Sequence, residues 1–165
     1  MNYFYLDPSA LVKRYHIESG SDTVDYLLDK LLSNDKKLGI TSIWSIPEII
    51  AALNRRKNEQ KVSVKKFSLL VSAFLNEVSK FFTVDFNQGK IVESVSLILK
   101  HNLNSVDALH LVSIKESNEI AKLVGNSLVV VAADERLLRS AMMEGFEVLN
   151  PEVSEKNDVD KLLIM

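Results

Sequence analysis

Short apolar segments alternate along the chain with longer segments whose apolar residues recur every three or four positions. The longer segments have the spacing of amphipathic helices, as in residues 23–32, 67–78 and 91–99. From the apolar segments we predict strands at residues 3–6, 38–42, 83–86, 127–133 and 146–149. Segment 127–133 is almost wholly apolar, which is typical of a central strand covered on both faces of a parallel sheet. This alternation predicts an α/β fold with right-handed crossovers.

Length and composition indicate a single domain. The chain has 165 residues, of which 47% are hydrophobic, and this length is usual for one domain. The strand and helix patterns fade after Pro151, so we expect the domain to cover residues 1–151 and residues 152–165 to form a C-terminal tail. The chain has no cysteines, which excludes zinc ribbons, iron–sulfur clusters, thiol catalysis and a disulfide scaffold.

The charge and the first residues narrow the class further. The formal net charge is -2 at pH 7, so the chain is not a strongly basic nucleic-acid coat protein, although a local basic patch stays open. No basic segment precedes Asp7, as it would in a signal peptide. No apolar run approaches the ~18 residues that cross a bilayer. We therefore expect a cytoplasmic protein that does not enter a membrane.

Four acidic residues stand where predicted strands end or helices begin: Asp7, Glu48, Asp107 and Asp134. Sites in open parallel sheets form beyond the carboxyl ends of the strands, so these side chains could share one edge. Carboxylates that converge without cations repel one another strongly unless a divalent ion neutralises them. Hard oxygen ligands in a chain without thiols indicate magnesium or manganese.

Each acid also has a purely structural interpretation, which the residues alone leave open. The two acids that directly follow strands have the position of helix N-caps. Glu48 stands three residues after Ser45, which is the spacing of a capping box. Asp107 would favour the macrodipole of a helix that Ser105 caps.

Five motifs in order resemble the PIN-domain ribonucleases, of the kind found as toxins of VapBC-type toxin–antitoxin pairs. The motifs are YLDPSALVK (residues 5–13), TSIWSIPEIIAALNR (41–55), DALHL (107–111), VAADERLL (131–138) and GFEVLNP (145–151). Together they extend over residues 1–151. The resemblance implies a PIN-like, three-layer α/β/α fold with a central five-stranded parallel sheet of order 3-2-1-4-5. It also implies an endoribonuclease that uses Mg²⁺ or Mn²⁺ and leaves a 5′ phosphate and a 3′ hydroxyl, a homodimer, and a cognate antitoxin protein.

The acidic site of this family maps onto Asp7, Glu48, Asp107 and Asp134, which we expect to act in catalysis and to bind the metal. Asp7 and Asp107 are the expected direct ligands, while Glu48 and Asp134 would bind through water or orient the nucleophile. The chain departs from the pattern at Ala132, where many members have a Thr or Ser whose hydroxyl could orient a carboxylate or a metal-bound water.

Four further residues are candidates for substrate binding: Ser9, Lys13, Arg14 and Arg55. Ser9 follows Asp7 by two positions and could bind a ligand water or a phosphate, or only polarise a helix start. The three cations could follow the phosphate backbone of RNA. A run of charges is more often a solvated helix face, so this assignment has a structural alternative as well.

The alternative function is a catalytically degenerate PIN-like scaffold that acts as a protein-interaction module, which the change at Ala132 leaves open. His16, His101 and His110 lack metal-ligand spacing, and His110 is expected to pack or to form local hydrogen bonds. The single tryptophan, Trp44, is expected in the core or in an interface.

Overall fold

The computed structural model describes residues 1–34 and 36–164. All strands run parallel in one sheet of order β3-β2-β1-β4-β5. The strands are β1 (Asn2–Leu6), β2 (Gly39–Ser42), β3 (Phe82–Val84), β4 (Ser127–Val131) and β5 (Glu147–Leu149). The five predicted strands and the implied sheet order are therefore confirmed. The central pair is in register from Asn2 opposite Ser127 to Leu6 opposite Val131, so β1 and β4 end together.

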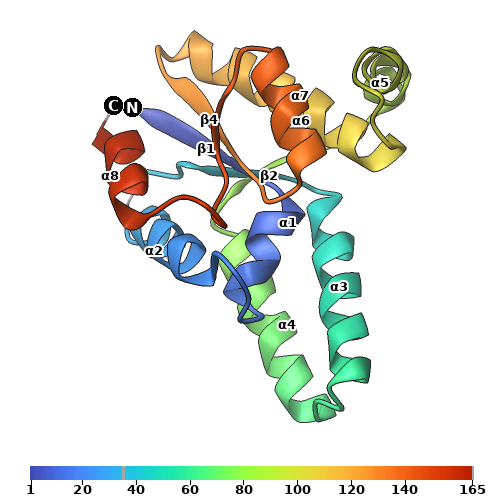
Figure 1. The fold of residues 1–165 in the computed structure, drawn as a ribbon, viewed down its shortest axis with the longest axis vertical. Coiled ribbons are helices and arrows are strands. Elements are labelled where there is room, and N and C mark those ends of the chain that lie inside the picture. Colours follow the sequence, from blue (N-terminus) through green and yellow to red (C-terminus); the bar gives the residue numbers. More distant parts are fainter. Residues whose placement is uncertain (35, 165) are drawn as a thin grey trace.

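Helices cover both faces of this sheet (Figure 1), which makes the three-layer α/β/α architecture that the resemblance implies. They are α1 (Pro8–Leu11), the 3₁₀ turn η1 (Val12–Arg14), α2 (Ser21–Leu32), α3 (Ser45–Glu59), α4 (Val64–Val78), α5 (Gln88–His101), α6 (Ser105–Leu123), α7 (Glu135–Met143) and α8 (Lys156–Ile164). Figure 1 shows α2, α4 and α8 on one side of the sheet and α6 and α7 on the other.

The side chains of β1 contribute to two separate hydrophobic cores, because successive side chains of a strand point in opposite directions. Phe4 and Leu6 pack with the core that includes residues of α1, α2, α3, α4 and α8. Tyr5, between them, packs with the core that includes residues of α5, α6 and α7. The period-two pattern of the strand thus decides which helices each residue meets, and it places Tyr5 on the α6 side.

The expected tail at residues 152–165 contributes helix α8 to the first core. Val159 is completely buried and Leu162 nearly so. Asn2 Nδ2 donates to the Leu162 carbonyl oxygen at 2.9 Å, and the Tyr26 hydroxyl donates to Asp160 Oδ1 at 2.8 Å. The segment is therefore docked through most of its length, while Met165 lies outside the described residues.

No helix in residues 1–34 and 36–164 is both long enough and apolar enough to cross a membrane.

Candidate functional site

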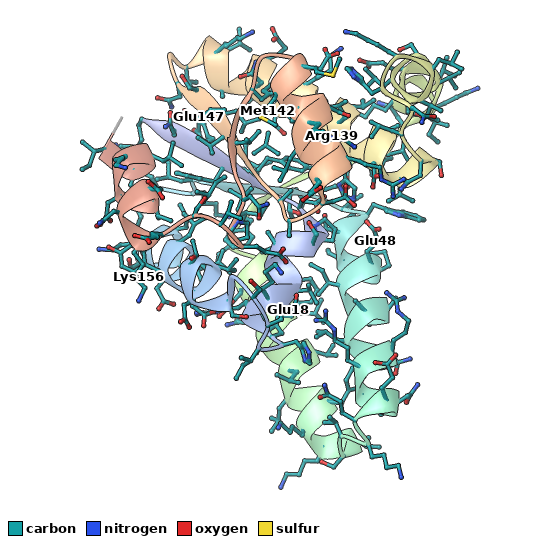
Figure 2. All side chains as sticks on the ribbon, viewed as in Figure 1. Glu18, Glu48, Arg139, Met142, Glu147 and Lys156 are labelled. Carbon is teal, nitrogen blue, oxygen red and sulfur yellow. The ribbon has the colours of Figure 1, made fainter. Side chains whose placement is uncertain are left out.

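The four predicted acids lie at the carboxyl edge of the sheet. Asp7 follows β1 and Asp134 follows β4 after a short connection, and these strands are direct neighbours. The Asp7 backbone N–H donates to the Val131 carbonyl oxygen at 3.0 Å, which ties the two strand ends together. Glu48 lies in the first turn of α3, at the end of that helix nearest the sheet (Figure 2), and Asp107 lies in the first turn of α6. Two strand ends and two helix starts thus supply the acids.

Asp7 is held by Ser9 in a buried position. Its side chain caps α1, and Oδ2 accepts from the Ser9 N–H at 2.9 Å and from the Ser9 hydroxyl at 2.5 Å. The same hydroxyl accepts from the backbone N–H groups of Ala133 (2.9 Å) and Asp134 (3.3 Å). Burial raises the pKa of Asp7, although the His110 charge and the Ser9 hydrogen bonds oppose the shift. Ser9 therefore orients one acid and joins the ends of β1 and β4, next to the position where Ala132 lacks a hydroxyl.

Glu48 is bound by a histidine and does not form the expected capping box. Trp44 is the N-cap of α3 and makes no side-chain cap hydrogen bond among the described residues, and the Ser45 hydroxyl instead pairs with Thr41 at 2.8 Å. Glu48 Oε2 lies 2.8 Å from His110 Nε2. The capping-box interpretation of Glu48 is therefore wrong, because the glutamate turns across to α6 and leaves its own helix end.

His110 connects the acids to the core. Its Nδ1 lies 2.9 Å from the Tyr5 hydroxyl and 3.9 Å from Asp7 Oδ1, and only 2% of the residue is exposed. Burial lowers the pKa of His110, but the hydrogen bond to Glu48 and the negative charges of Asp7, Glu48 and Asp107 outweigh burial, so the net shift is upward. The imidazole is the one basic ring among these acids within the described part of the chain.

Asp107 and Asp134 both lie at helix starts, and the charge of Asp134 acts on Asp107. Asp107 exchanges two hydrogen bonds of 2.8 Å with Asn104, which replaces Ser105 as the expected cap of α6. Asp134 Oδ1 accepts from the Arg136 and Leu137 N–H groups at 2.8 and 3.1 Å, so the N-cap interpretation of Asp134 is confirmed. Burial, followed by the charges of Asp134 and Asp7, raises the pKa of Asp107 to about 6.

The charge of one acid therefore changes the pKa of another. Asp7 and Asp134 both raise the pKa of Asp107, and Glu48 contributes to the raised pKa of Asp7. The cations that oppose these shifts are His110 and, for Asp107, Arg136 in the first turn of α7. The edge carries more negative charge than its neighbours compensate.

A divalent ion fits this edge in its chemistry. The available donors are carboxylate and hydroxyl oxygens, which Mg²⁺ and Mn²⁺ prefer. Burial, and then the charges of Asp134 and Asp7, raises the pKa of Asp107, and a bound cation would offset both effects. In residues 1–34 and 36–164, however, no three histidine or acidic side chains are gathered closely enough to form a metal site. The acids thus form an open edge of carboxylates and no closed ligand cage.

The predicted substrate-binding cations are placed differently from one another. Lys13 is 4% exposed, and its Nζ lies 2.6 Å from Glu152 and 3.2 Å from Glu18, the residue labelled beside α1 in Figure 2. Arg14 pairs with three acids, at 2.7 to 3.4 Å: Asp25, Asp29 and Glu77. Arg55 is exposed on α3, two helical turns beyond Glu48. Lys13 and Arg14 are therefore engaged within the fold, and Arg55 is the predicted cation that faces solvent.

Sequence reasoning assigned no role in the site to His110 or Tyr5, and it expected Trp44 to be in the core or an interface. The signal for His110 was present, because it follows Asp107 by three positions on one helix and so shares its face. Tyr5 gave no signal beyond its place in an apolar strand. Trp44 is 47% exposed at the start of α3, one turn before Glu48, so it does not belong to the core.

Neither a protein-family model nor a curated protein sequence matches this chain. Several solved structures share its fold, and three illustrate the likeness. PAE2754 from Pyrobaculum aerophilum is 16% identical with a TM-score of 0.60, over 99% of this chain and 96% of that one. FitAcB from Neisseria gonorrhoeae is 16% identical with a TM-score of 0.63, over 92% and 99%. A toxin–antitoxin complex from Klebsiella pneumoniae is 15% identical with a TM-score of 0.53, over 89% and 96%.

At these identities the likeness establishes the fold. The sheet order and the layers agree with the resemblance that the motifs indicated. The chain therefore has the PIN-like fold predicted from its sequence, and it shares that fold with a known toxin–antitoxin complex.

Proposed function

We propose that this protein is a divalent-metal-dependent endoribonuclease and the toxin of a toxin–antitoxin pair. The observation that carries the proposal is the gathering of acids at the carboxyl edge of the sheet, where burial, and then the charges of Asp134 and Asp7, raises the pKa of Asp107 to about 6. Strongly perturbed acids at the edge where α/β sheets build their sites are typical of a functional centre. The PIN-like fold and the four acids of the family motif agree with this interpretation.

The four acids are the residues that would hold the ion. Asp7 and Asp107 are proposed as direct ligands, and Glu48 and Asp134 as residues that bind through water or orient the nucleophile. When bound, Mg²⁺ or Mn²⁺ would supply a water of lowered pKa and stabilise the charge on the leaving 3′ oxygen. Attack on phosphorus with loss of that oxygen leaves a 5′ phosphate and a 3′ hydroxyl.

The protein's own residues prepare this reaction. Ser9 fixes the Asp7 carboxylate, and Asp7 is buried. We propose that Arg136, whose charge lowers the pKa of Asp107, contacts a substrate phosphate and that exposed Arg55 extends this contact along α3. Both contacts are electrostatic and would weaken as salt increases.

A protein partner belongs to the same proposal. One of the solved structures with this fold is a toxin–antitoxin complex, which supports an antitoxin as the cognate partner of this chain. We propose that a segment of the antitoxin covers the acidic edge and that the toxin forms a homodimer. The apolar faces of α2 and α3 pack mostly in the core, since Leu27, Leu28, Ile49 and Leu53 are buried.

The test is cleavage of a mixed pool of structured and single-stranded RNA. Purified protein is incubated with Mg²⁺, with Mn²⁺ and with chelator, beside Asp7→Asn and the matched control Asp22→Asn, which changes an exposed aspartate on α2. We expect metal-dependent cutting by wild type and Asp22→Asn and none by Asp7→Asn. Cutting that persists in chelator or in Asp7→Asn would contradict the proposal, and no cutting together with no metal binding would favour the degenerate scaffold.

A further inference from the structure

A buried chain of hydrogen bonds leads from strand β1 to Glu48. The Tyr5 hydroxyl lies 2.9 Å from His110 Nδ1, and His110 Nε2 lies 2.8 Å from Glu48 Oε2. Tyr5 is completely buried and His110 is 2% exposed. Buried polar groups cost free energy unless they are hydrogen-bonded, and here each ring has its partner. These two hydrogen bonds connect the buried Tyr5 to Glu48, one acid of the candidate site.

The direction of the second hydrogen bond does not depend on the protonation state of the ring. In the neutral imidazole, the Tyr5 hydroxyl donates to Nδ1, which leaves the hydrogen on Nε2. In the imidazolium, both nitrogens carry hydrogen and Nδ1 donates to the tyrosine oxygen. In either form the Nε2–H group faces Glu48. Burial, and then the Asp7 charge, raises the pKa of the Tyr5 phenol well above its ordinary value, so the hydroxyl stays intact.

The hydrogen bond to His110 fixes the position of Glu48. The glutamate side chain is 31% exposed and has a flexible stem, so without a partner its carboxylate could turn toward solvent. The Glu48 charge is also the last and smallest of the causes that act on the raised pKa of Asp7, so the two charges oppose each other. The hydrogen bond from His110 holds the Glu48 carboxylate at the edge.

We propose that His110, held in place by Tyr5, is a positioning residue that fixes the Glu48 carboxylate at the acidic edge for binding of the divalent ion. This inference rests on the proposed function. Residues behind a metal ligand commonly set its orientation, and their loss typically weakens metal binding by about 10- to 100-fold.

The test is a calorimetric titration of Mn²⁺ into the full-length protein and its variants. His110→Asn removes the nitrogen that reaches Glu48, whereas the longer amide of His110→Gln restores a donor near that point. Tyr5→Phe removes only the hydroxyl and serves if a change at His110 prevents folding. His101→Asn is the matched control, since the His101 side chain is also buried and lies 2.7 Å from a glutamate distant in the sequence, Glu144, which is not one of the four acids.

We expect His110→Asn to weaken Mn²⁺ binding by about 10-fold or more, and His110→Gln to stay within about 3-fold of wild type. Tyr5→Phe should weaken binding by a smaller factor, and His101→Asn should leave it unchanged in the folded protein. In a Glu48→Gln background, His110→Asn should have no further effect, because the carboxylate it positions is gone.

Two outcomes would overturn the inference in distinguishable ways. Mn²⁺ binding that is equal in wild type, His110→Asn and Tyr5→Phe would overturn it and leave the proposed function standing. No Mn²⁺ binding by wild type would overturn the proposed function and this inference with it. Equal losses from His110→Asn in the wild-type and Glu48→Gln backgrounds would show that His110 acts on the ion by a route other than Glu48, which also contradicts the inference.

Discussion

Two buried histidine side chains each pair with a glutamate at nearly the same distance, but the surroundings of the two pairs differ. His101 lies 2.7 Å from Glu144, and His110 lies 2.8 Å from Glu48. The first glutamate also meets Lys100 at 2.6 Å and Lys115 at 3.7 Å. The hydrogen bond from Lys100, with the help of His101 and Lys115, lowers the pKa of Glu144 to about 2.

The second pair lies among negative charges. Asp7 approaches His110 at 3.9 Å, and the pKa values of both Asp7 and Asp107 are raised from their ordinary values. A hydrogen-bonded His–Glu pair is thus no marker of function by itself. What distinguishes the two pairs is the charge that surrounds them. Lysines compensate Glu144, whereas Glu48 lies near the acids at the edge where we propose that a cation binds.

The largest expected difference between the two regions is in cleavage. Asp7→Asn should reduce metal-dependent RNA cleavage on the order of 100-fold or more while the free energy of unfolding is unchanged or higher, because a buried, repelled charge is removed. Glu144→Gln should do the reverse and lower stability without changing cleavage per folded molecule. Cleavage rates and urea unfolding of both variants check this, and a fall in stability with Asp7→Asn would contradict the contrast.

Breaking a compensated cluster elsewhere should have the next largest effect. Lys13→Met leaves Glu18 and Glu152 without their buried partner. We expect the free energy of unfolding to fall by about 1–3 kcal/mol, less than for a fully buried pair because both glutamates are partly exposed. Urea denaturation measures the loss, and cleavage per folded molecule should stay at the wild-type level. A loss of RNA affinity at wild-type stability would instead support the substrate-binding role predicted for Lys13.

The two regions should respond to pH in opposite directions. The pKa of Asp107 is about 6 in the folded protein against an ordinary 3.8, so without metal its contribution to stability falls as pH rises through that interval. The pKa of Glu144 is about 2 against 4.5, so its contribution grows as pH rises from about 2 to 4.5 and persists above it. The free energy of unfolding is measured from pH 3 to pH 7, at about every half pH unit. The decrease in stability with rising pH that comes from Asp107 should be absent in Asp107→Asn and present in Glu144→Gln. An unchanged slope in Asp107→Asn would remove that acid from the repulsive cluster.

The smallest expected effect is at Arg55, which lies on α3 beyond Glu48 and pairs with no acid within the described residues. Arg55→Ala should weaken RNA binding a few-fold, because one phosphate contact is lost. For a single-stranded RNA, the slope of the logarithm of the binding constant against the logarithm of salt concentration should become shallower by about 0.7. Filter binding to an uncleaved complex of Asp7→Asn at several salt concentrations measures both. A salt dependence equal to that of the parent would show that Arg55 makes no phosphate contact.

The sequence predicted what depends on local periodicity and order along the chain. Apolar runs located all five strands, and the four acids were predicted at the ends of strands and the starts of helices. The sheet order was implied by the family resemblance, and it is this order that makes β1 and β4 neighbours and so brings Asp7 and Asp134 to one edge. The N-cap at Asp134 followed from local sequence as well.

What the sequence did not predict depends on partners distant along the chain. Glu48 has the spacing of a capping box, but His110, 62 residues away, takes its carboxylate. Lys13 was predicted to be a cation that binds substrate, but in the fold it is paired with Glu152, 139 residues away. Asn104 and Ser105 are adjacent candidates for the same cap, and the difference between them is too small for spacing to decide. Local periodicity does not predict which side chains pair when they are distant along the chain.

The most direct measurement of the central claim is the change in unfolding free energy caused by Mn²⁺, compared between wild type and Asp7→Asn. An ion that binds only the folded acidic edge should stabilise wild type by about 2.7 kcal/mol at a concentration 100 times its Kd. We expect this gain in wild type and in Glu144→Gln and none in Asp7→Asn. Equal stabilisation of Asp7→Asn, or no stabilisation of wild type, would contradict it.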